Sequence, residues 1–345
     1  MPDATNGQKQ LGETALDVSY LDLSSARARC ANGSRLLGVV GYGTERPDFL
    51  PPHTPFISTP LKPALGGAGL ELWQTPSPCR GITLGPVTGA CCDDFAFGVI
   101  PLEDAQGRDL EEAVHAAYLA IFDFLETTGF TAPLRFWNYL SDITREEAGL
   151  ERYRWFNIGR QRAFEARLRE ALPPAASGVG GTHGTSAIYF LAAPAPARPV
   201  ENPRQVSAFA YPPVYGPQSP SFSRASVYNA RAATLMFISG TASILGHESR
   251  HANDLPAQIT ETIENLRAVI RAAGVTPPGR WAFKIYLRHP AYRDEVELAL
   301  ASAFSTAAQR LYLHGEICRT ELMLEIEAFY SAPKSANDPC AAPSP

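Results

Sequence analysis

Hydrophobic residues recur every three to four positions in several segments, which is the period of an amphipathic helix. In residues 110–126 the apolar positions 114, 118, 121, 122 and 125 fall on one side, and Gly129 follows as a helix terminator. Asp254 is a natural N-cap for a later helix, with a proline in its first turn. The helices predicted in this way cover residues 110–126, 150–168, 254–273 and 292–304.

Short apolar runs bounded by glycine, proline or polar residues predict β-strands between these helices. The clearest predicted strands cover residues 34–43, 95–102, 134–143, 186–193, 235–240 and 281–289. Two stretches predict irregular structure instead: a glycine-rich loop at 174–185 and a proline-rich wall at 206–224. The order of strands and helices therefore indicates an α+β or α/β protein in which helices cover one face of a sheet.

The proline-rich connector near residues 195–205 is the best candidate for a boundary between two halves. We therefore expect an N-terminal α/β domain at 16–200 and a C-terminal domain at 201–331. Residues 1–15 and 332–345 have the polar, proline-rich composition of disordered tails.

The last regular stretch, residues 311–330, concentrates the candidate chemistry. Glu325 and Glu327 alternate with Leu324, Ile326 and Ala328, and this period of two predicts a strand with both carboxylates on one face. One interpretation is an edge strand whose polar face is solvated. The other is that the two carboxylates face a pocket built by the rest of the chain.

Composition and charge exclude several functional classes. The chain has 345 residues, 45% of them hydrophobic, and a net charge of −5 without a block of basic residues. Nucleic acid is therefore not an expected partner. No run of about 18 apolar residues indicates a membrane span, and the polar N-terminus carries no apolar signal segment, so we expect a cytoplasmic protein. The six cysteines form no CxxC pair and are expected to be free thiols.

Two short motifs resemble known catalytic signatures only superficially. The run at 178–184 is rich in glycine but lacks the lysine and hydroxyl residue of a phosphate-binding loop. Residues 247–251 read HESRH, but they lie in a predicted turn rather than on the helix that a zinc site of this type needs. No nucleophile-elbow motif is present. We therefore expect neither a phosphate-binding loop nor a bound metal.

A set of arginines and tyrosines is more informative. Arginine binds carboxylates with two parallel hydrogen bonds, and tyrosine adds a hydroxyl donor on a flat apolar ring. Loops positioned by a scaffold are where such contacts concentrate. The alternative is that these arginines form surface or interdomain salt bridges. The candidate residues for binding a small dianionic carboxylate are Arg160, Tyr211, Tyr215, Arg224 and Arg319.

The second half resembles the RidA/YjgF family through the segments ISGTAS, QITETIENLRAVIRAAG, KIYL and CRTELMLEIEA. The whole chain resembles the chorismatase family, which adds an N-terminal domain to a RidA-like one. The segments that carry this resemblance lie between residues 130 and 330: 135–143, 153–164, 181–193, 202–225, 237–251 and 315–329.

The resemblance implies a cofactor-free enzyme that removes the enolpyruvyl group of chorismate as pyruvate. It also implies that a glutamate of the closing strand protonates the enol ether. We assign this role to Glu325, with Glu327 as the alternative. Gly240 and Cys318 resemble the glycine and cysteine of the family branch that forms 3-hydroxybenzoate, so we expect this product. Another branch hydrolyses chorismate to a dihydroxycyclohexadiene carboxylate. Less favoured alternatives are a RidA-like imine or enamine hydrolase and a non-catalytic metabolite-binding protein. We expect a monomer whose N-terminal half completes the site.

Overall fold

The computed structural model of the protein describes residues 15–31, 35–102, 105–168, 172–181, 185–275 and 279–334. The predicted tails at 1–15 and 332–345 lie outside these ranges, except for their innermost residues. The last strand continues to Pro333, so the regular structure extends two residues beyond the predicted boundary at 331.

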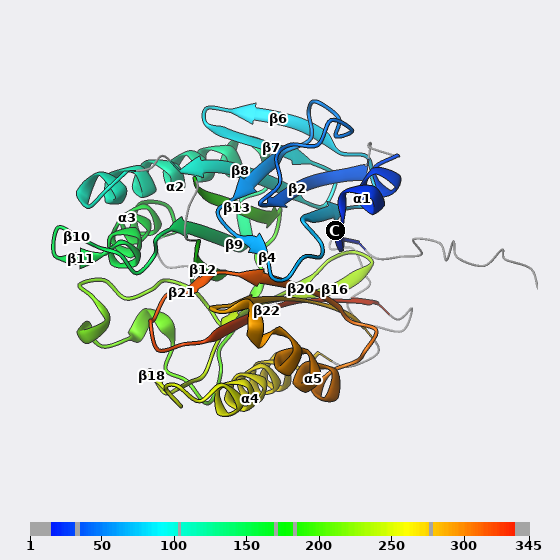
Figure 1. The fold of residues 1–345 in the computed structure, drawn as a ribbon. Helices are drawn as coiled ribbons and strands as arrows, with labels where there is room; N and C mark the ends of the chain where they lie inside the picture. The colour runs from blue at the N-terminus through cyan, green and yellow to red at the C-terminus, as the bar shows by residue number, and fades with distance from the viewer. Residues whose placement is uncertain are drawn as a thin grey trace, which may run out of the picture.

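The first of two seven-stranded sheets is built mostly from residues 80–193 and is covered on its outer face by two helices (Figure 1). These helices are α2 (Arg108–Thr128) and α3 (Arg152–Arg167). The apolar side predicted for α2 is buried, and Gly129 ends the helix in the left-handed region at φ 80°. The strands in spatial order are β21 (Glu316–Ile317), β12 (Ala175–Gly181), β9 (Ala132–Ser141), β13 (Ser186–Ala193), β8 (Ala96–Leu102), β7 (Val87–Cys91) and β6 (Arg80–Leu84).

The second seven-stranded sheet belongs mainly to residues 198–333, and two helices cover its outer face (Figure 1). These are α4 (Leu255–Ala273), which Asp254 caps by accepting a hydrogen bond from the Ala257 amide, and α5 (Arg293–Ala303). The strands in spatial order are β14 (Arg198–Val200), β15 (Ala225–Asn229), β16 (Ala233–Thr241), β22 (Leu324–Pro333), β19 (Arg280–Leu287), β20 (Gln309–His314) and β4 (Lys62–Pro63).

A smaller four-stranded sheet, which the sequence pattern did not separate from the rest, precedes both. Helix α1 (Leu23–Arg29) packs beside it. Its strands in spatial order are β1 (Asp17–Leu21), β5 (Leu70–Gln74), β2 (Leu36–Tyr42) and β3 (Phe56–Thr59). Short elements complete the fold: the β10–β11 hairpin (Glu146–Glu147 and Leu150–Glu151), the β17–β18 hairpin (Ile244–Leu245 and Glu248–Ser249), and the 3-10 turns η2 (Ala208–Ala210), η3 (Pro213–Tyr215) and η4 (Pro290–Tyr292).

The inner faces of the three sheets share one hydrophobic core, while the helices form separate cores on the outer faces. Strand β9 illustrates the alternation, because Trp137 and Tyr139 point into the shared core whereas Phe136 and Leu140 point toward α2 and α3. The predicted α+β fold with helices on one face of each large sheet is confirmed. The division into two domains stays a prediction, because β4 and β21 each join the sheet of the other half.

One predicted loop is wrong. Residues Ala175–Gly181 form strand β12, which lies inside the first sheet between β9 and β21. Its glycines are required by close packing: a Cβ at Gly180 would overlap Ile143, and one at Gly181 would overlap the Pro60 backbone. Glycine in a strand marks such close approaches, but its poor strand propensity made the segment resemble a loop.

Four buried charges connect the three sheets. Lys284 of β19 bridges Glu71 of β5 at 2.7 Å and Glu327 of β22 at 3.0 Å, and Arg135 of β9 bridges Glu327 at 2.8 Å. We call Glu71, Lys284, Glu327 and Arg135 the buried charge chain. Burial would lower the pKa of Lys284, but the two carboxylates raise it well above its ordinary value. The charges alternate in sign along the buried charge chain, so each one is compensated.

Among the described residues, no helix is both long and apolar enough to cross a membrane.

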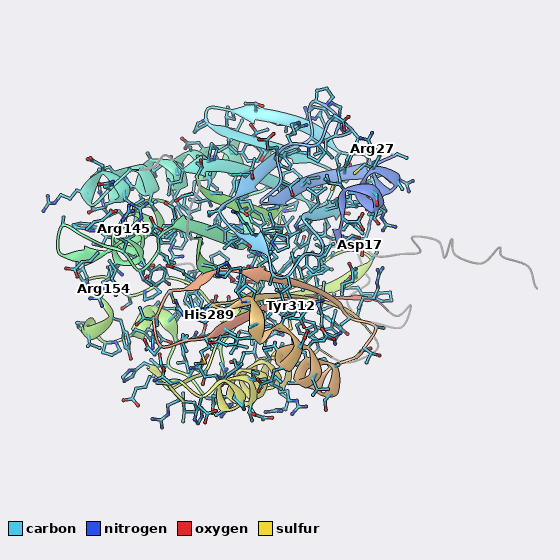
Figure 2. All side chains as sticks on the ribbon, in the orientation of Figure 1. Asp17, Arg27, Arg145, Arg154, His289 and Tyr312 are labelled. Carbon is cyan, nitrogen blue, oxygen red and sulfur yellow. The ribbon has the colours of Figure 1, made fainter. Side chains whose placement is uncertain are left out.

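Replacing Lys284 with methionine should destabilise the protein by about 3–5 kcal/mol, because it leaves two buried carboxylates without their shared cation. Chemical denaturation measures the change. The matched control is Arg27→Met, because Arg27 lies at the surface (Figure 2). This change breaks an ion pair with Asp48 in which the two side chains are 62% and 81% exposed, so it should have almost no effect on stability. Equal stabilities of the two variants would contradict a structural role for the buried charge chain.

Candidate active site

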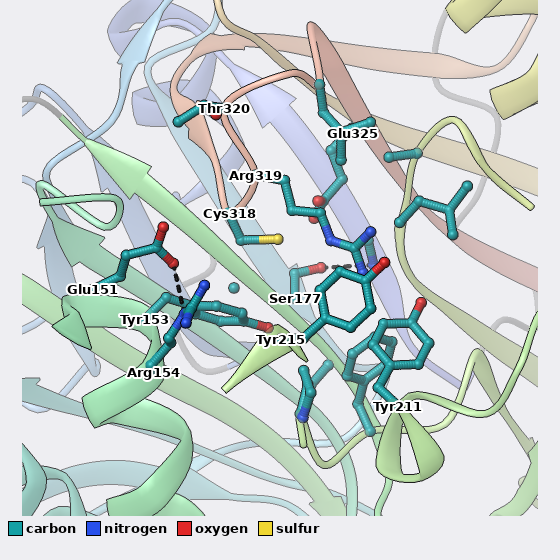
Figure 3. A pocket seen from close by; sticks show the side chains of 18 of the residues that line it. Glu151, Tyr153, Arg154, Ser177, Tyr211, Tyr215, Cys318, Arg319, Thr320 and Glu325 are labelled. Carbon is teal, nitrogen blue, oxygen red and sulfur yellow. Dashed lines mark hydrogen bonds and ion pairs between the residues drawn. The ribbon is translucent and has the colours of Figure 1, made fainter. Parts of the chain in front are cut away.

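A cavity of about 240 Å³ lies where the two large sheets meet (Figure 3). Its walls come from the start of α3, from β12, from the proline-rich segment, from the end of β16, and from the turn before β22. The residues that line it include Glu151, Tyr153, Arg154, Ser177, Gly178, Tyr211, Val214, Tyr215, Phe222, Arg224, Gly240, Cys318, Arg319, Thr320 and Glu325. Apolar, aromatic and arginine side chains thus surround one carboxyl group from β22.

That carboxyl group belongs to Glu325, which is only 6% exposed. Strand β22 lies between β16 and β19, so the edge-strand interpretation is wrong. No side chain in the described part of the protein hydrogen bonds to the Glu325 carboxyl. Burial, and secondarily the charge of Glu327, raises its pKa to about 8, although Arg135 and Arg224 act in the opposite direction. Glu325 therefore carries a proton at neutral pH.

Glu327 lies on the same face of β22 but in the opposite environment. Its oxygens accept hydrogen bonds from Ser177 at 2.6 Å, Trp137 at 2.6 Å and Tyr286 at 2.9 Å, in addition to the ion pairs with Arg135 and Lys284. Burial alone would raise the pKa of Glu327, but the two cations and the donors hold it at about 2. Glu327 is consequently ionised and does not line the cavity.

Gly240 is the close neighbour of Glu325. The pairing of β16 with β22 shifts register between Ile238 and Thr241, which brings the Gly240 backbone against the Glu325 side chain. A Cβ at position 240 would overlap a carboxyl oxygen of Glu325. Because Gly240 does not have a positive φ, this contact and not a turn conformation requires glycine here.

Arg224 and Tyr211 form the first cationic wall of the cavity. The Nη2 of Arg224 donates to the Tyr211 hydroxyl at 2.8 Å and to the Val206 carbonyl at 2.9 Å. The guanidinium stacks over the Phe222 ring at 5.1 Å. The Nε of Arg224 is buried without a hydrogen-bond partner. An unpartnered buried donor is costly, and the Arg224 side chain also lines the cavity, so its guanidinium is a candidate for binding an anionic ligand.

Arg319 forms the second cationic wall. Its guanidinium lies 4.1 Å from the centre of the Tyr215 ring and 5.3 Å from that of Tyr211 (Figure 3). It donates to the His247 carbonyl at 2.9 Å and to Ser249 Oγ at 3.1 Å, while the Tyr215 hydroxyl lies 3.2 Å from His247 Nδ1. The hydrogen bonds and the aromatic stacking hold the guanidinium in one orientation.

The Cys318 thiol and the Tyr153 ring line the side of the cavity opposite the two tyrosines (Figure 3). Burial, with a contribution from Glu325, raises the pKa of Cys318 to about 12, so the thiol stays protonated. Burial also raises the pKa of Tyr153. Both groups are therefore neutral.

Comparison with known proteins identifies the family. Residues 71–192 match the family described as chorismatase FkbO/Hyg5-like, N-terminal. A 3-hydroxybenzoate synthase of Streptomyces hygroscopicus is 36% identical over 330 residues, which cover 90% of this chain and 96% of that protein. The chain belongs to the chorismatase family.

Two further relatives agree with this family. A chorismatase of Streptomyces rapamycinicus is 36% identical over 271 residues, which cover 74% of this chain and 80% of that protein. The crystal structure of a chorismatase matches with a TM-score of 0.82 at 29% identity, covering 93% of this chain and 99% of that one. The similarity thus extends over both large sheets and includes part of the first 100 residues, in which no motif was recognised.

Within the chorismatase fold, seven of the eight residues predicted for the site line the cavity. The exception is Arg160, whose side chain is 2% exposed. It donates to Asn157 at 2.9 Å and stacks on Phe156 and Phe164 inside the core beneath α3. Arg160 is therefore not among the residues that line the cavity, and its role in substrate binding stays a prediction.

Sequence reasoning missed other parts of the chorismatase site. Tyr153 and Arg154 lie at the start of α3, and Arg154 forms an ion pair with Glu151 at 3.1 Å. Ser177 lies on β12, which was predicted as a loop. The available signals were the position of the helix start and the polar residue among glycines, and neither distinguishes a site from a surface.

Replacing Gly240 with alanine should displace the Glu325 carboxyl, because the new methyl group and the carboxyl oxygen occupy the same space. Overpacking of this kind typically costs about 1–3 kcal/mol. A crystal structure of the variant and its denaturation curve measure the two effects. Gly178→Ala is the comparison, since its Cβ would meet the edge of the Tyr153 ring and leave Glu325 in place. An unmoved Glu325 in Gly240→Ala would overturn the steric interpretation.

Proposed function

We propose that this protein converts chorismate into 3-hydroxybenzoate and pyruvate. The observation that carries the proposal is the buried Glu325 carboxyl, which has no hydrogen-bond partner among the described residues and lines a cavity that also presents two arginines. Its raised pKa, about 8, favours the protonated form. A neutral carboxylic acid in such a place is suited to donating a proton to carbon. The membership of the chain in the chorismatase family supports the same substrate.

Arg224 and Arg319 are the proposed carboxylate-binding residues. Chorismate carries two carboxylates, one on the ring and one on the enolpyruvyl group, and each needs a cationic partner inside a largely apolar cavity. Both guanidiniums are already oriented by Tyr211 and Tyr215, so little conformational freedom is lost on binding. Tyr153 supplies a flat surface beside the ring.

Glu325 then protonates the methylene carbon of the enol ether, which generates an oxocarbenium ion. The resulting carboxylate lies beside this cation and stabilises it. The neighbouring ring hydroxyl attacks the cation and gives up its proton, which forms a cyclic ketal between the two ring oxygens. Loss of the proton from the ring carbon that bears the ether oxygen makes the ring aromatic and breaks the bond between the neighbouring ring carbon and its oxygen, which stays with the ketal carbon. The resulting hemiketal collapses to pyruvate, and the oxygen left on the ring takes up a proton to become the 3-hydroxyl group. Two protons are taken up and two are released, so no water is consumed.

Hydrolysis is the alternative outcome of the same oxocarbenium ion, because water attack would release pyruvate and leave a dihydroxycyclohexadiene carboxylate. Gly240 leaves room for the ring beside Glu325, and the Cys318 thiol is a poor group for ordering a water molecule. Both features favour the intramolecular reaction.

The proposal includes a monomeric, cytoplasmic enzyme. The N-terminal half supplies Glu151, Tyr153, Arg154 and Ser177 to the cavity, which supports a monomer whose own two halves form the site. The five cysteines in the described ranges are free thiols, as expected in a reducing compartment.

Glu325→Gln should lower kcat by at least about 100-fold, because the amide cannot donate the proton that the mechanism requires. Pyruvate release from chorismate, coupled to lactate dehydrogenase, measures the rate without added metal or nucleotide. The KM for chorismate should change little, since Glu325 is not a carboxylate-binding residue. Near-native turnover in this variant would exclude Glu325 as the acid.

Cys318→Ser should raise the fraction of hydrolysis product, because a hydroxyl orders water better than a thiol does. Chromatography of the ring product separates 3-hydroxybenzoate from the non-aromatic diol, while pyruvate gives the total turnover. If the wild-type protein itself yields the diol, the proposed branch is wrong although the chorismate-cleaving activity stands.

A further inference from the structure

Two glutamates of strand β22 lie in opposite electrostatic environments. Glu325 and Glu327 are separated by one residue of β22, so their side chains leave the same face of the strand. Glu325 has no hydrogen-bond partner within the described ranges, whereas five side chains bind Glu327. The proposed mechanism uses only the first of them, which leaves the second without an assigned role in the reaction.

The groups that bind Glu327 come from three strands in both large sheets. Arg135 and Trp137 lie on β9, Ser177 on β12, and Lys284 and Tyr286 on β19. The shortest of these contacts, 2.6 Å, involve Trp137 and Ser177, one on each carboxylate oxygen. The Glu327 carboxylate is therefore fixed in position as well as in charge.

We propose that Glu327 is a positioning residue whose fixed negative charge keeps Glu325 in its protonated, proton-donating form. This inference rests on the proposed function, because it assigns a cause to the state of the proposed acid. A second negative charge close to a buried anion is costly, so Glu325 retains its proton. Glu327 thereby acts on the reaction through Glu325 without touching the substrate.

The other groups near Glu325 either favour its ionised form, and so oppose the effect of Glu327, or carry no charge. Arg135 from β9 and Arg224 from the start of β15 both favour the ionised form of Glu325. Cys318 and Tyr153 are neutral, as their raised pKa values require. Burial raises the pKa of Glu325 most, and Glu327 adds to it. Without Glu327 the two cations would oppose burial alone, so the pKa of Glu325 would fall and its ionised form would be favoured more than in the wild-type protein.

A purely structural role for Glu327 makes a different prediction, and Glu71 provides the matched control. Glu71 binds Lys284 from the other side and accepts hydrogen bonds from Tyr42, Trp73 and Tyr189. It is as buried as Glu327 and belongs to the same buried charge chain, but it does not contribute to the pKa of Glu325. Glu→Gln at either position weakens the same chain, and only the one at 327 removes a charge beside Glu325.

The test is the dependence of kcat/KM on pH for the wild-type protein and for Glu327→Gln. The acid form of Glu325 is active, so wild-type activity should fall as the pH rises through about 8. In Glu327→Gln this alkaline limb should move to lower pH by about one to two units, because a like charge is lost and Arg135 is left uncompensated. Glu327→Asp retains the charge and should return the limb toward its wild-type position.

Glu71→Gln should leave the alkaline limb in place even if it lowers stability. An unmoved limb in Glu327→Gln, or an equal shift in Glu71→Gln, would overturn the proposal. If Glu327→Gln does not fold, Arg135→Gln is the second variant. Its limb should move to higher pH, because a cation that favours ionised Glu325 is lost, and a limb that stays or falls contradicts the proposal.

A titration of the Glu325 carboxyl separates this inference from the proposed function. Carbon NMR of protein labelled at the glutamate carboxyl carbons follows the pKa of Glu325 directly, with Glu325→Gln identifying the signal. If the wild-type protein does not convert chorismate, the proposed function fails, and the titration in Glu327→Gln still decides whether Glu327 holds the proton on Glu325.

Discussion

The buried charge chain of Glu71, Lys284, Glu327 and Arg135 determines how the three sheets meet. Removing a charge from water costs several kcal/mol, and only close partners of opposite sign and good hydrogen bonds return that cost. Each sheet contributes at least one member of the chain, so a shift of any sheet would leave a buried charge without its partner. The apolar shared core permits many packings of similar area, and the chain selects one of them.

The same interaction gives the active site its chemistry. Because a strand repeats every two residues, fixing Glu327 in the buried charge chain also fixes the direction in which Glu325 points. The register shift in β16 then places Gly240, and no larger side chain, against that carboxyl. Strand β22 thus supplies both an anion, Glu327, which its partners keep charged, and an acid, Glu325, which its surroundings keep neutral.

The parts of the fold and of the site that were predictable depend on local patterns. The period of α2, the cap of α4 and the alternation around Glu325 were visible in the sequence. The role of Glu327 was not, because its partner Arg135 lies 192 residues away and pairing at that distance leaves no local signal. The position of Arg160 was not predictable for a related reason, since a helix in contact with other elements on several sides does not reveal which of them an arginine faces. Strand β12 was missed because packing, and not strand propensity, selected its glycines.

The placement of two carboxylates together also suits a reaction that returns its proton. In the proposed mechanism, Glu325 is ionised once it has protonated the enol ether, and its carboxylate then lies beside the cationic intermediate and stabilises it. Once the cation collapses, that stabilisation is lost, and the repulsion from Glu327 makes ionised Glu325 a stronger base than an isolated glutamate. Aromatisation releases a ring proton at this moment, and Glu325 can recover it. An acid with a pKa of about 8 is thus matched to both halves of the cycle near neutral pH, as donor at the start and as acceptor at the end.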